Sequence, residues 1–213
     1  MLPAVLAIVV AAVVALALAG ADRLAARTVT RRVARRVQAA AAAREPAHVH
    51  IAGVPFVTQA VRGRYRHVDV ALAAFGINGV EFSSLVATLS GVRAPLRALL
   101  AGDGLVVGQV SATVTIPLTV LRQRLPRGLT VAAHRGDLRI SGTLMYLPVY
   151  GRLAVTAERH RLYFTPLGLG GFPALVGFGL VVPGLPDRLA IETVQVTAAG
   201  LVVRLSGADV HLG

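Results

Sequence analysis

Apolar and polar residues alternate with a period of two through most of the chain after residue 46. The clearest runs are residues 48–51, 68–70, 110–116, 138–141, 191–196 and 201–205. Successive side chains of a β-strand point to opposite faces of the sheet, so this pattern is typical of strands with one covered face. Turn signals lie between or after these runs at 77–79, 102–104, 135–137, 199–200 and 206–207. The pattern predicts a mainly antiparallel β-rich body with one covered face.

Two short helices are predicted within the strand-rich body. Residues 95–100 and 117–122 each begin with a proline, which suits the first turn of a helix because its missing N–H has no partner there. Each segment lies in a connection between two predicted strands. We therefore expect a few short helices that link strands, in a fold of the α+β class.

The first 21 residues are apolar and carry no charge. A helix that spans a bilayer needs roughly 20 such residues. Ala19-Gly20-Ala21 also has the A-x-A pattern of a signal-peptide cleavage site. We expect residues 1–21 to be a signal peptide or a membrane anchor, and residues 22–213 to form a single domain.

Residues 22–44 are expected to form a basic amphipathic helix that precedes the β-rich body at 46–213. Asp22 is a plausible N-cap, and Pro46 disfavours helix beyond Arg44. Small apolar residues share one face of this helix: Ala26, Val29, Val33, Val37 and Ala40. Six arginines occupy the opposite side: Arg23, Arg27, Arg31, Arg32, Arg35 and Arg36. These arginines either contact an anionic membrane surface, or are simply solvated while the apolar face covers the core, and both can hold together.

The charge of this segment and the cleavage pattern lead to opposite topologies. Arginines directly after a membrane helix favour a cytoplasmic location for the rest of the chain, whereas the A-x-A site favours export. The residues alone leave both topologies open.

Composition restricts the chemistry of the chain. The net charge of +12 favours anionic partners. Aromatic residues make up only 5% of the chain and tryptophan is absent, so stacking surfaces for bases are poor and we expect no nucleic-acid partner. There is no cysteine, no G-x-S-x-G sequence, and no paired carboxylates, so no catalytic residue is predicted. The pair His48 and His50 lacks the further ligands that a metal site usually has, so we expect no metal and no cofactor.

Residues 167–183 are almost all apolar, are rich in Gly and Pro, and carry no charge. This composition suits a core strand, a lid, or the wall of an apolar cavity. A chain with 55% hydrophobic residues can line such a cavity, since ligand pockets are mostly apolar with a few polar groups.

Two segments carry a family resemblance. Residues 53–59, GVPFVTQ, followed by residues 63–70, GRYRHVDV, resemble the signature of actinobacterial exported phospholipid-binding proteins linked to lipomannan mannan-chain elongation. The family pattern has Phe where this chain has Val54. Residues 183–189, PGLPDRL, and the strand that leads to Gly207 are similar to the C-terminal end of that family, and the resemblance covers about residues 20–213.

The resemblance implies a lipid-binding domain on the envelope side of the membrane. It implies a long N-terminal helix packed on a strongly curved, mainly antiparallel β-sheet that encloses an apolar groove for acyl chains. It implies phospholipid binding in support of lipoglycan elongation or lipid transfer, and no catalysis. Two alternatives stay open: a hydrolase or transferase acting on lipid-linked glycan, or a membrane-tethered scaffold with a filled core.

Candidate lipid-contacting residues come from the shared motif and from the Gly-rich apolar stretch. Arg62, Arg64 and Arg66 can pair with a lipid phosphate through two parallel hydrogen bonds, although a solvated strand end explains them equally well. Gln59 is expected to tie the loop backbone to the strands. The apolar candidates are Phe56, Val68, Val70, Leu175, Phe178 and Leu180.

Overall fold

A computed structural model describes the chain from residue 22 onward, with short gaps. The described residues are 22–39, 41–53, 55–77, 79–101, 104–144, 146–168, 176–182, 186 and 188–212. The predicted signal or anchor segment, residues 1–21, and the predicted lipid contact Leu175 lie outside these ranges. None of the helices in the described ranges combines the length and apolar character needed to cross a membrane.

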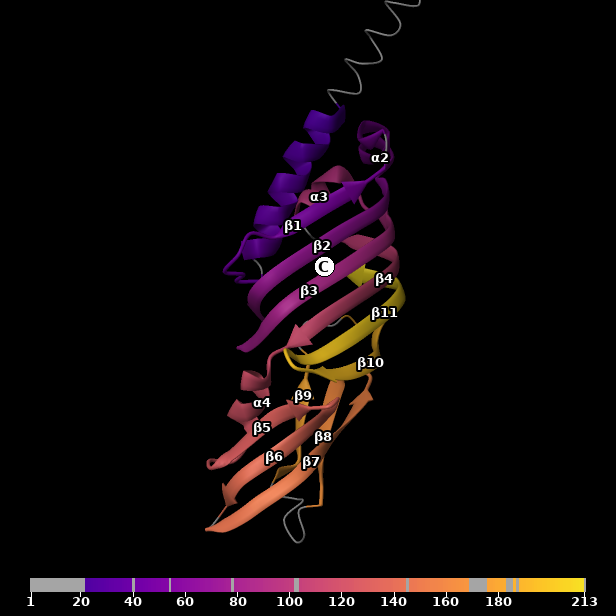
Figure 1. Ribbon diagram of the computed structural model, residues 1–213. Helices are drawn as coiled ribbons and strands as arrows, with labels where there is room; N and C mark the ends of the chain where they lie inside the picture. Colours follow the sequence, from indigo (N-terminus) through magenta and orange to yellow (C-terminus); the bar gives the residue numbers. More distant parts are fainter. Residues whose placement is uncertain are drawn as a thin grey trace, which may run out of the picture.

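Two antiparallel sheets follow one another along an elongated molecule (Figure 1). The first sheet has the strand order β1-β2-β3-β4-β11-β10 and the second has the order β5-β6-β7-β8-β9. The strands of the first sheet are β1 (His48–Ala52), β2 (Arg64–Ile77), β3 (Val80–Arg93), β4 (Leu105–Ile116), β10 (Leu189–Thr197) and β11 (Gly200–Leu212). Those of the second are β5 (Leu129–His134), β6 (Asp137–Leu144), β7 (Leu147–Glu158), β8 (Arg161–Leu167) and β9 (Phe178–Val181).

Short helices in the described part connect these strands, and residues 22–39 form the N-terminal helix. The short helices are α2 (Phe56–Arg62), α3 (Leu96–Ala101) and α4 (Leu118–Arg124). The predicted α+β class and the short connecting helices α3 and α4 are confirmed. The β-structure is divided between two sheets, however, because the chain leaves the first sheet after β4 and builds the second before it returns as β10.

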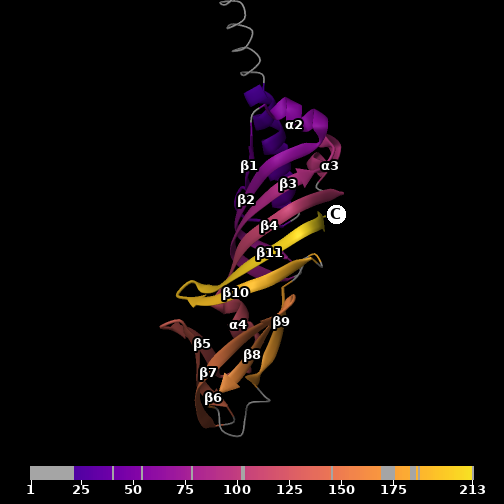
Figure 2. The ribbon, with the colours of Figure 1, turned by 90° about the vertical axis from the view of Figure 1, so that its right-hand side faces the viewer.

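The N-terminal helix lies against the first sheet (Figure 2), and its apolar residues pack against the core. Val33 is buried, and Val29 and Val37 pack against the core beside it. The six arginines of the opposite side are all exposed. The helix was expected to continue to Arg44, but the chain turns after residue 39 and meets the end of β2, where Arg44 N donates to Ala74 O and Gly76 N donates to Ala41 O, both at 3.1 Å.

A line of irregular positions crosses the first sheet and contributes to its curvature. Gly91 on β3 and Asp209 on β11 have φ angles of +64° and +49°, and Gly108 on β4 lies between them. A residue with left-handed backbone angles rotates its strand, so the alternation of inward and outward side chains shifts by one position at this line. On β4, for example, Val107 and Val110 are both buried although an alternating strand would separate them. The sheet can therefore bend while its interior stays apolar.

The turn predicted at residues 206–207 is wrong. Strand β11 runs through it, from Gly200 to Leu212. Gly207 is required for a different reason: a Cβ at this position would overlap the carbonyl oxygen of Arg188. Gly207 therefore marks a close backbone approach between β11 and Arg188, the residue before β10.

The two sheets share one continuous apolar core. The turn between β7 and β8 meets the start of β10, where His160 Nε2 lies 2.9 Å from Leu189 O and Ile191 N donates to Arg159 O at 3.4 Å. Leu121 of α4 is completely buried beside the second sheet. These contacts attach the second sheet to the first at β10.

Candidate functional site

A groove of about 500 Å³ runs between the N-terminal helix and strand β1. We call it the helix–β1 groove. The N-terminal helix contributes one side of its wall: Asp22, Arg23, Ala26, Arg27, Thr30 and Arg31. The other side comes from β1 and the motif after it: His50, Ile51, Ala52, Gly53 and Phe56.

Helix geometry explains the polar side of the groove. Arg23, Arg27 and Arg31 are spaced four residues apart, so their side chains form one row along the helix. The opposite wall is an edge of the first sheet, because β2 is the one described strand that pairs with β1. A basic row therefore faces the free edge of a strand.

The base of the groove is apolar. Ile51 and Phe56 are buried, and Ala26 packs against the core from the helix. The groove thus offers guanidinium groups beside hydrocarbon surface. This combination suits an anionic amphiphile, whose charged group and apolar chain need different surroundings.

The arginines of the groove are free to bind an anion. Among the described residues the ion pairs are Arg44–Glu81 at 3.2 Å and Arg152–Asp137 at 3.9 Å, and neither involves the groove. The acidic residue of the groove, Asp22, is buried and faces α2. A row of positive charges that form no ion pair in the described part attracts negatively charged ligands.

Asp22 holds α2 in place. Its carboxylate oxygens accept hydrogen bonds from the backbone N–H groups of Phe56 at 2.8 Å and Val57 at 2.7 Å. The sequence suggested that Asp22 caps its own helix, whereas these contacts cap α2, which the sequence did not predict. Because Phe56 belongs to the base of the groove, Asp22 also positions that base.

The family-like motif builds the end of the groove next to α2. Gln59 Oε1 accepts a hydrogen bond from Arg66 N at 3.1 Å, so Gln59 contacts strand backbone as expected, although it lies in helix α2 and not in a loop. Gly63 ends α2 in a left-handed conformation with φ of +60°, and its carbonyl oxygen accepts a bond from Ala94 N at 2.8 Å. A Cβ on Gly63 would lie 2.9 Å from Ala94 O, so glycine is needed there.

The predicted lipid-contacting residues do not gather in one place. Phe56 lies in the helix–β1 groove, whereas Arg62, Arg64 and Arg66 are exposed beyond it, at the end of α2 and the start of β2. Val68 is buried and Val70 half-buried within β2. Phe178 stacks on Phe164, with ring centroids 4.6 Å apart, and Leu180 is buried. Both belong to β9 in the second sheet, while Leu175 lies outside the described residues.

The six arginines predicted to meet a membrane surface divide into two groups. Arg23, Arg27 and Arg31 line the groove, whereas Arg32, Arg35 and Arg36 are exposed elsewhere on the helix. Sequence reasoning missed His50, Ile51 and Ala52 as wall residues. The four-residue spacing of the arginines was visible in the sequence, but the strand edge that faces them was not.

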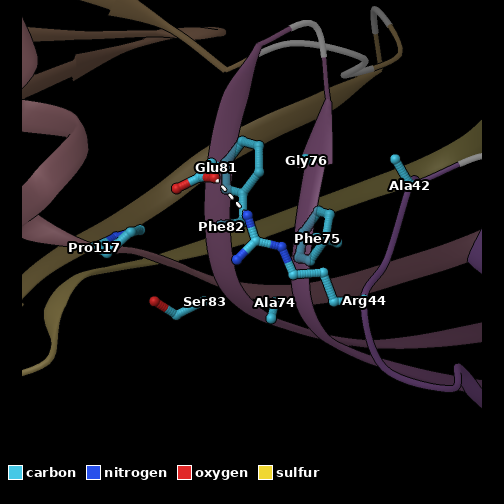
Figure 3. A pocket seen from close by; sticks show the side chains of 9 residues that line it. All are labelled: Ala42, Arg44, Ala74, Phe75, Gly76, Glu81, Phe82, Ser83 and Pro117. Carbon is cyan, nitrogen blue, oxygen red and sulfur yellow. Dashed lines mark hydrogen bonds and ion pairs between the residues drawn. The ribbon is translucent and has the colours of Figure 1, made fainter.

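A smaller hollow of about 270 Å³ lies at the other end of the N-terminal helix (Figure 3). Phe75 and Phe82 stack beside it with ring centroids 5.0 Å apart. Its arginine, Arg44, already pairs with Glu81. We therefore favour the helix–β1 groove, whose arginines form no such ion pair with any residue that the structure describes.

No three histidine, aspartate or glutamate side chains in the described ranges come close enough together to hold a metal ion. The pair His48 and His50 lies on β1, with Asp69 opposite His50. Asp69 Oδ1 accepts a hydrogen bond from the Thr88 hydroxyl at 2.8 Å. These residues carry structural contacts within the sheet.

Replacing Tyr65 with Phe is expected to raise the free energy of unfolding by about 1 kcal/mol at neutral pH. Tyr65 is only 1% exposed, and within the described part its hydroxyl has no hydrogen-bond partner. An unsatisfied buried hydroxyl is costly, so its removal stabilises the fold. Urea unfolding at pH 7 measures the change, and Tyr150→Phe, at an exposed position, is the control.

The same substitution changes the response to alkaline pH. Burial raises the pKa of the Tyr65 phenol above its ordinary value. At a pH between the ordinary and the raised pKa, the folded chain keeps a proton that the unfolded chain has released. Stability therefore declines as pH rises above about 10, and Tyr65→Phe is expected to remove this part of the decline. An unchanged alkaline decline in the variant would contradict this account.

Together, the fold and the groove define a class of protein. A helix packed on a curved sheet leaves a basic groove with an apolar base, suited to an anionic amphiphile. A family model described as LmeA-like phospholipid-binding matches residues 20–206, and the chain belongs to this family. No curated protein matches the chain, and no solved structure does.

Proposed function

We propose that the helix–β1 groove is where this chain binds phospholipid. Family membership supports a phospholipid ligand. The observation that favours this groove is the row of Arg23, Arg27 and Arg31, which forms no ion pair in the described part, beside an apolar base. In this arrangement the phosphate meets the guanidinium groups. Part of an acyl chain lies along Ala26, Ile51 and Phe56.

The chemistry of the groove matches the two parts of such a ligand. Guanidinium groups bind phosphate oxygens through paired, charge-assisted hydrogen bonds, which are stronger than bonds between neutral groups. The apolar base removes hydrocarbon from water. The proposed role is binding and holding the lipid, and we assign no catalytic step to it.

The test compares two double substitutions on the same helix. Arg27→Glu with Arg31→Glu reverses two charges in the groove, while Arg35→Glu with Arg36→Glu reverses two exposed charges outside it. Titration of the full chain with dihexanoyl phosphatidylglycerol, a short-chain lipid that stays monomeric in water, measures binding without a membrane. We expect the groove variant to bind at least about tenfold more weakly, since each lost charged hydrogen bond contributes about 1.4 kcal/mol or more.

The control variant is expected to bind within about twofold of the unchanged chain, because a remote exposed charge acts only through a screened field. Equal losses of lipid affinity in the two variants would show that the helix attracts lipid through its overall charge. Absence of binding by the unchanged chain would overturn the proposal itself.

We propose further that the chain works on the envelope side of the membrane, where it supports lipoglycan elongation or lipid transfer. The apolar residues 1–21, the A-x-A sequence at 19–21 and the motif at residues 53–70 support this location. The basic residues of the N-terminal helix suit contact with an anionic membrane surface. A β-lactamase domain fused to the C-terminus is expected to confer resistance, and a fusion that is expressed without resistance would contradict export.

A further inference from the structure

Three aliphatic side chains are exposed at one end of the molecule. Leu24 is 63% exposed, Val57 48% and Val61 83%. Val57 and Val61 are one turn apart on α2 and share its outer face. The bond from Val57 N to Asp22 brings α2 to the start of the N-terminal helix, two residues from Leu24. Figure 2 shows both elements at the same end, and we call this surface the α2 tip.

Arginines border the α2 tip on both sides. Arg23 and Arg27 come from the N-terminal helix, and Arg62 ends α2. Arg64 on β2 lies directly opposite Arg93 on β3. Like charges opposite each other on neighbouring strands are destabilising, and in the described part neither arginine has an acidic partner. An anionic ligand would relieve this repulsion.

The described acid at the tip, Asp22, does not offset this charge locally, because its oxygens are engaged with the backbone of α2. The surface is therefore aliphatic at its centre and positive around it. An anionic bilayer has the complementary arrangement, with negative headgroups above hydrocarbon. The uncharged apolar residues 1–21 also join the chain at Asp22, so a bilayer that holds them would lie at this end.

We propose that the α2 tip docks on an anionic phospholipid bilayer. Leu24, Val57 and Val61 enter the interfacial layer, while Arg62, Arg64 and Arg93 contact the headgroups. The end of the helix–β1 groove formed by Asp22, Gly53 and Phe56 lies beside this surface. Docking therefore brings the groove to the membrane, and this part rests on the proposed function.

A fluorescent probe placed on the tip tests the docking. The chain has no cysteine, so a single substitution gives a unique labelling site. Val61→Cys places a probe on the tip, and Val86→Cys places one at a valine that is 58% exposed on β3. The full chain is mixed with vesicles of phosphatidylcholine and phosphatidylglycerol at seven to three. The probe at 61 is expected to shift to the blue and to be quenched by brominated acyl chains, while the probe at 86 keeps its aqueous emission.

The charge requirement is tested separately. The triple substitution Arg62→Gln, Arg64→Gln and Arg93→Gln is combined with the probe at 61, and a matched triple at exposed positions of other strands is Arg139→Gln, Arg161→Gln and Arg204→Gln. We expect the tip triple to lose the difference in quenching between anionic and pure phosphatidylcholine vesicles. The matched triple is expected to keep that difference.

Three results would overturn the docking proposal. The first is a probe at 61 that stays in water or behaves like the probe at 86. The second is a spectral shift that grows with protein concentration in the absence of vesicles, which would indicate a second copy of the chain as the partner. The third is an unchanged charge dependence in the tip triple. The titration with monomeric short-chain lipid is independent of all three, so failure of docking and failure of lipid binding in the groove are distinguishable.

Discussion

Replacing Asp22 with Ala is expected to lower the free energy of unfolding by about 3 kcal/mol. The buried carboxylate accepts two short hydrogen bonds, from Phe56 N and Val57 N, and these are charge-assisted. Their removal leaves two backbone N–H groups at the start of α2 without a partner. It also separates α2 from the N-terminal helix, since this carboxylate is the hydrogen-bonded link between them in the described part.

The substitution is expected to weaken lipid binding as well as folding. Phe56 forms part of the base of the helix–β1 groove, and its position depends on the capped end of α2. Urea unfolding measures the first effect, and titration with short-chain phosphatidylglycerol measures the second. Asp137→Ala is the control, because its ion pair with Arg152 is long and exposed and should contribute less than about 1 kcal/mol. A variant at position 22 that unfolds like the control would contradict the role of this carboxylate.

Replacing Gly200 with Ala is expected to lower the free energy of unfolding by about 4 kcal/mol. A loss of this size is enough to unfold a domain of marginal stability. Gly200 has a φ of +139°, a conformation that L-residues rarely adopt. A Cβ here would overlap the carbonyl oxygen of Ile116 and lie 3.0 Å from Pro117 Cα. All of these neighbours are backbone atoms, so no side chain can rotate away to make room.

The position of Gly200 explains why the effect should be large. It starts β11, which pairs with both β4 and β10, and Ile116 ends β4 where the chain leaves for the second sheet. A shift here disturbs three strands together. Gly136→Ala is the matched control, with a φ of +85° and no atom within 4 Å of the added Cβ. Its expected loss of unfolding free energy is about 1 kcal/mol, from backbone strain. Similar losses of stability in the two variants would show that the positive φ alone, without the steric overlap, accounts for both.

Much of the fold can be predicted from local patterns. Period-two alternation located the strands β1, β4, β6, β10 and β11, because a strand with one covered face must alternate whatever its partners are. Prolines before residues 96 and 118 marked α3 and α4 for an equally local reason. The arginine side of the N-terminal helix is exposed, as its 100° periodicity predicted.

Other features depended on strand register and on close approaches between distant segments. The predicted turn at 206–207 was wrong because Gly207 accommodates Arg188 O, a contact across the sheet that has no local signal. Glycine commonly marks a turn or a strand end, yet Gly91 lies within β3, opposite Gly108. The sequence alone does not distinguish a glycine that avoids a steric overlap from a glycine that ends a strand.

The candidate site shows the same division. Phe56 was identified from its motif, and the arginines of the helix from their spacing. Phe178 and Leu180 were grouped with Phe56 because all three are apolar, but the structure places Phe178 and Leu180 in the second sheet. Arg93 was missed because only the pairing of β2 with β3 brings it opposite Arg64.

The sequence by itself determined what each segment is: a basic helix, a series of half-buried strands, and a motif that marks the phospholipid-binding family. These properties depend on neighbours within a few residues, and the chain records them directly. The tertiary structure alone decided that Asp22 caps α2 and that the row of Arg23, Arg27 and Arg31 faces the edge of β1. It also decided that the β-rich body divides into two sheets. Such contacts join residues that are tens of positions apart, and they form only when the whole apolar interior closes around them.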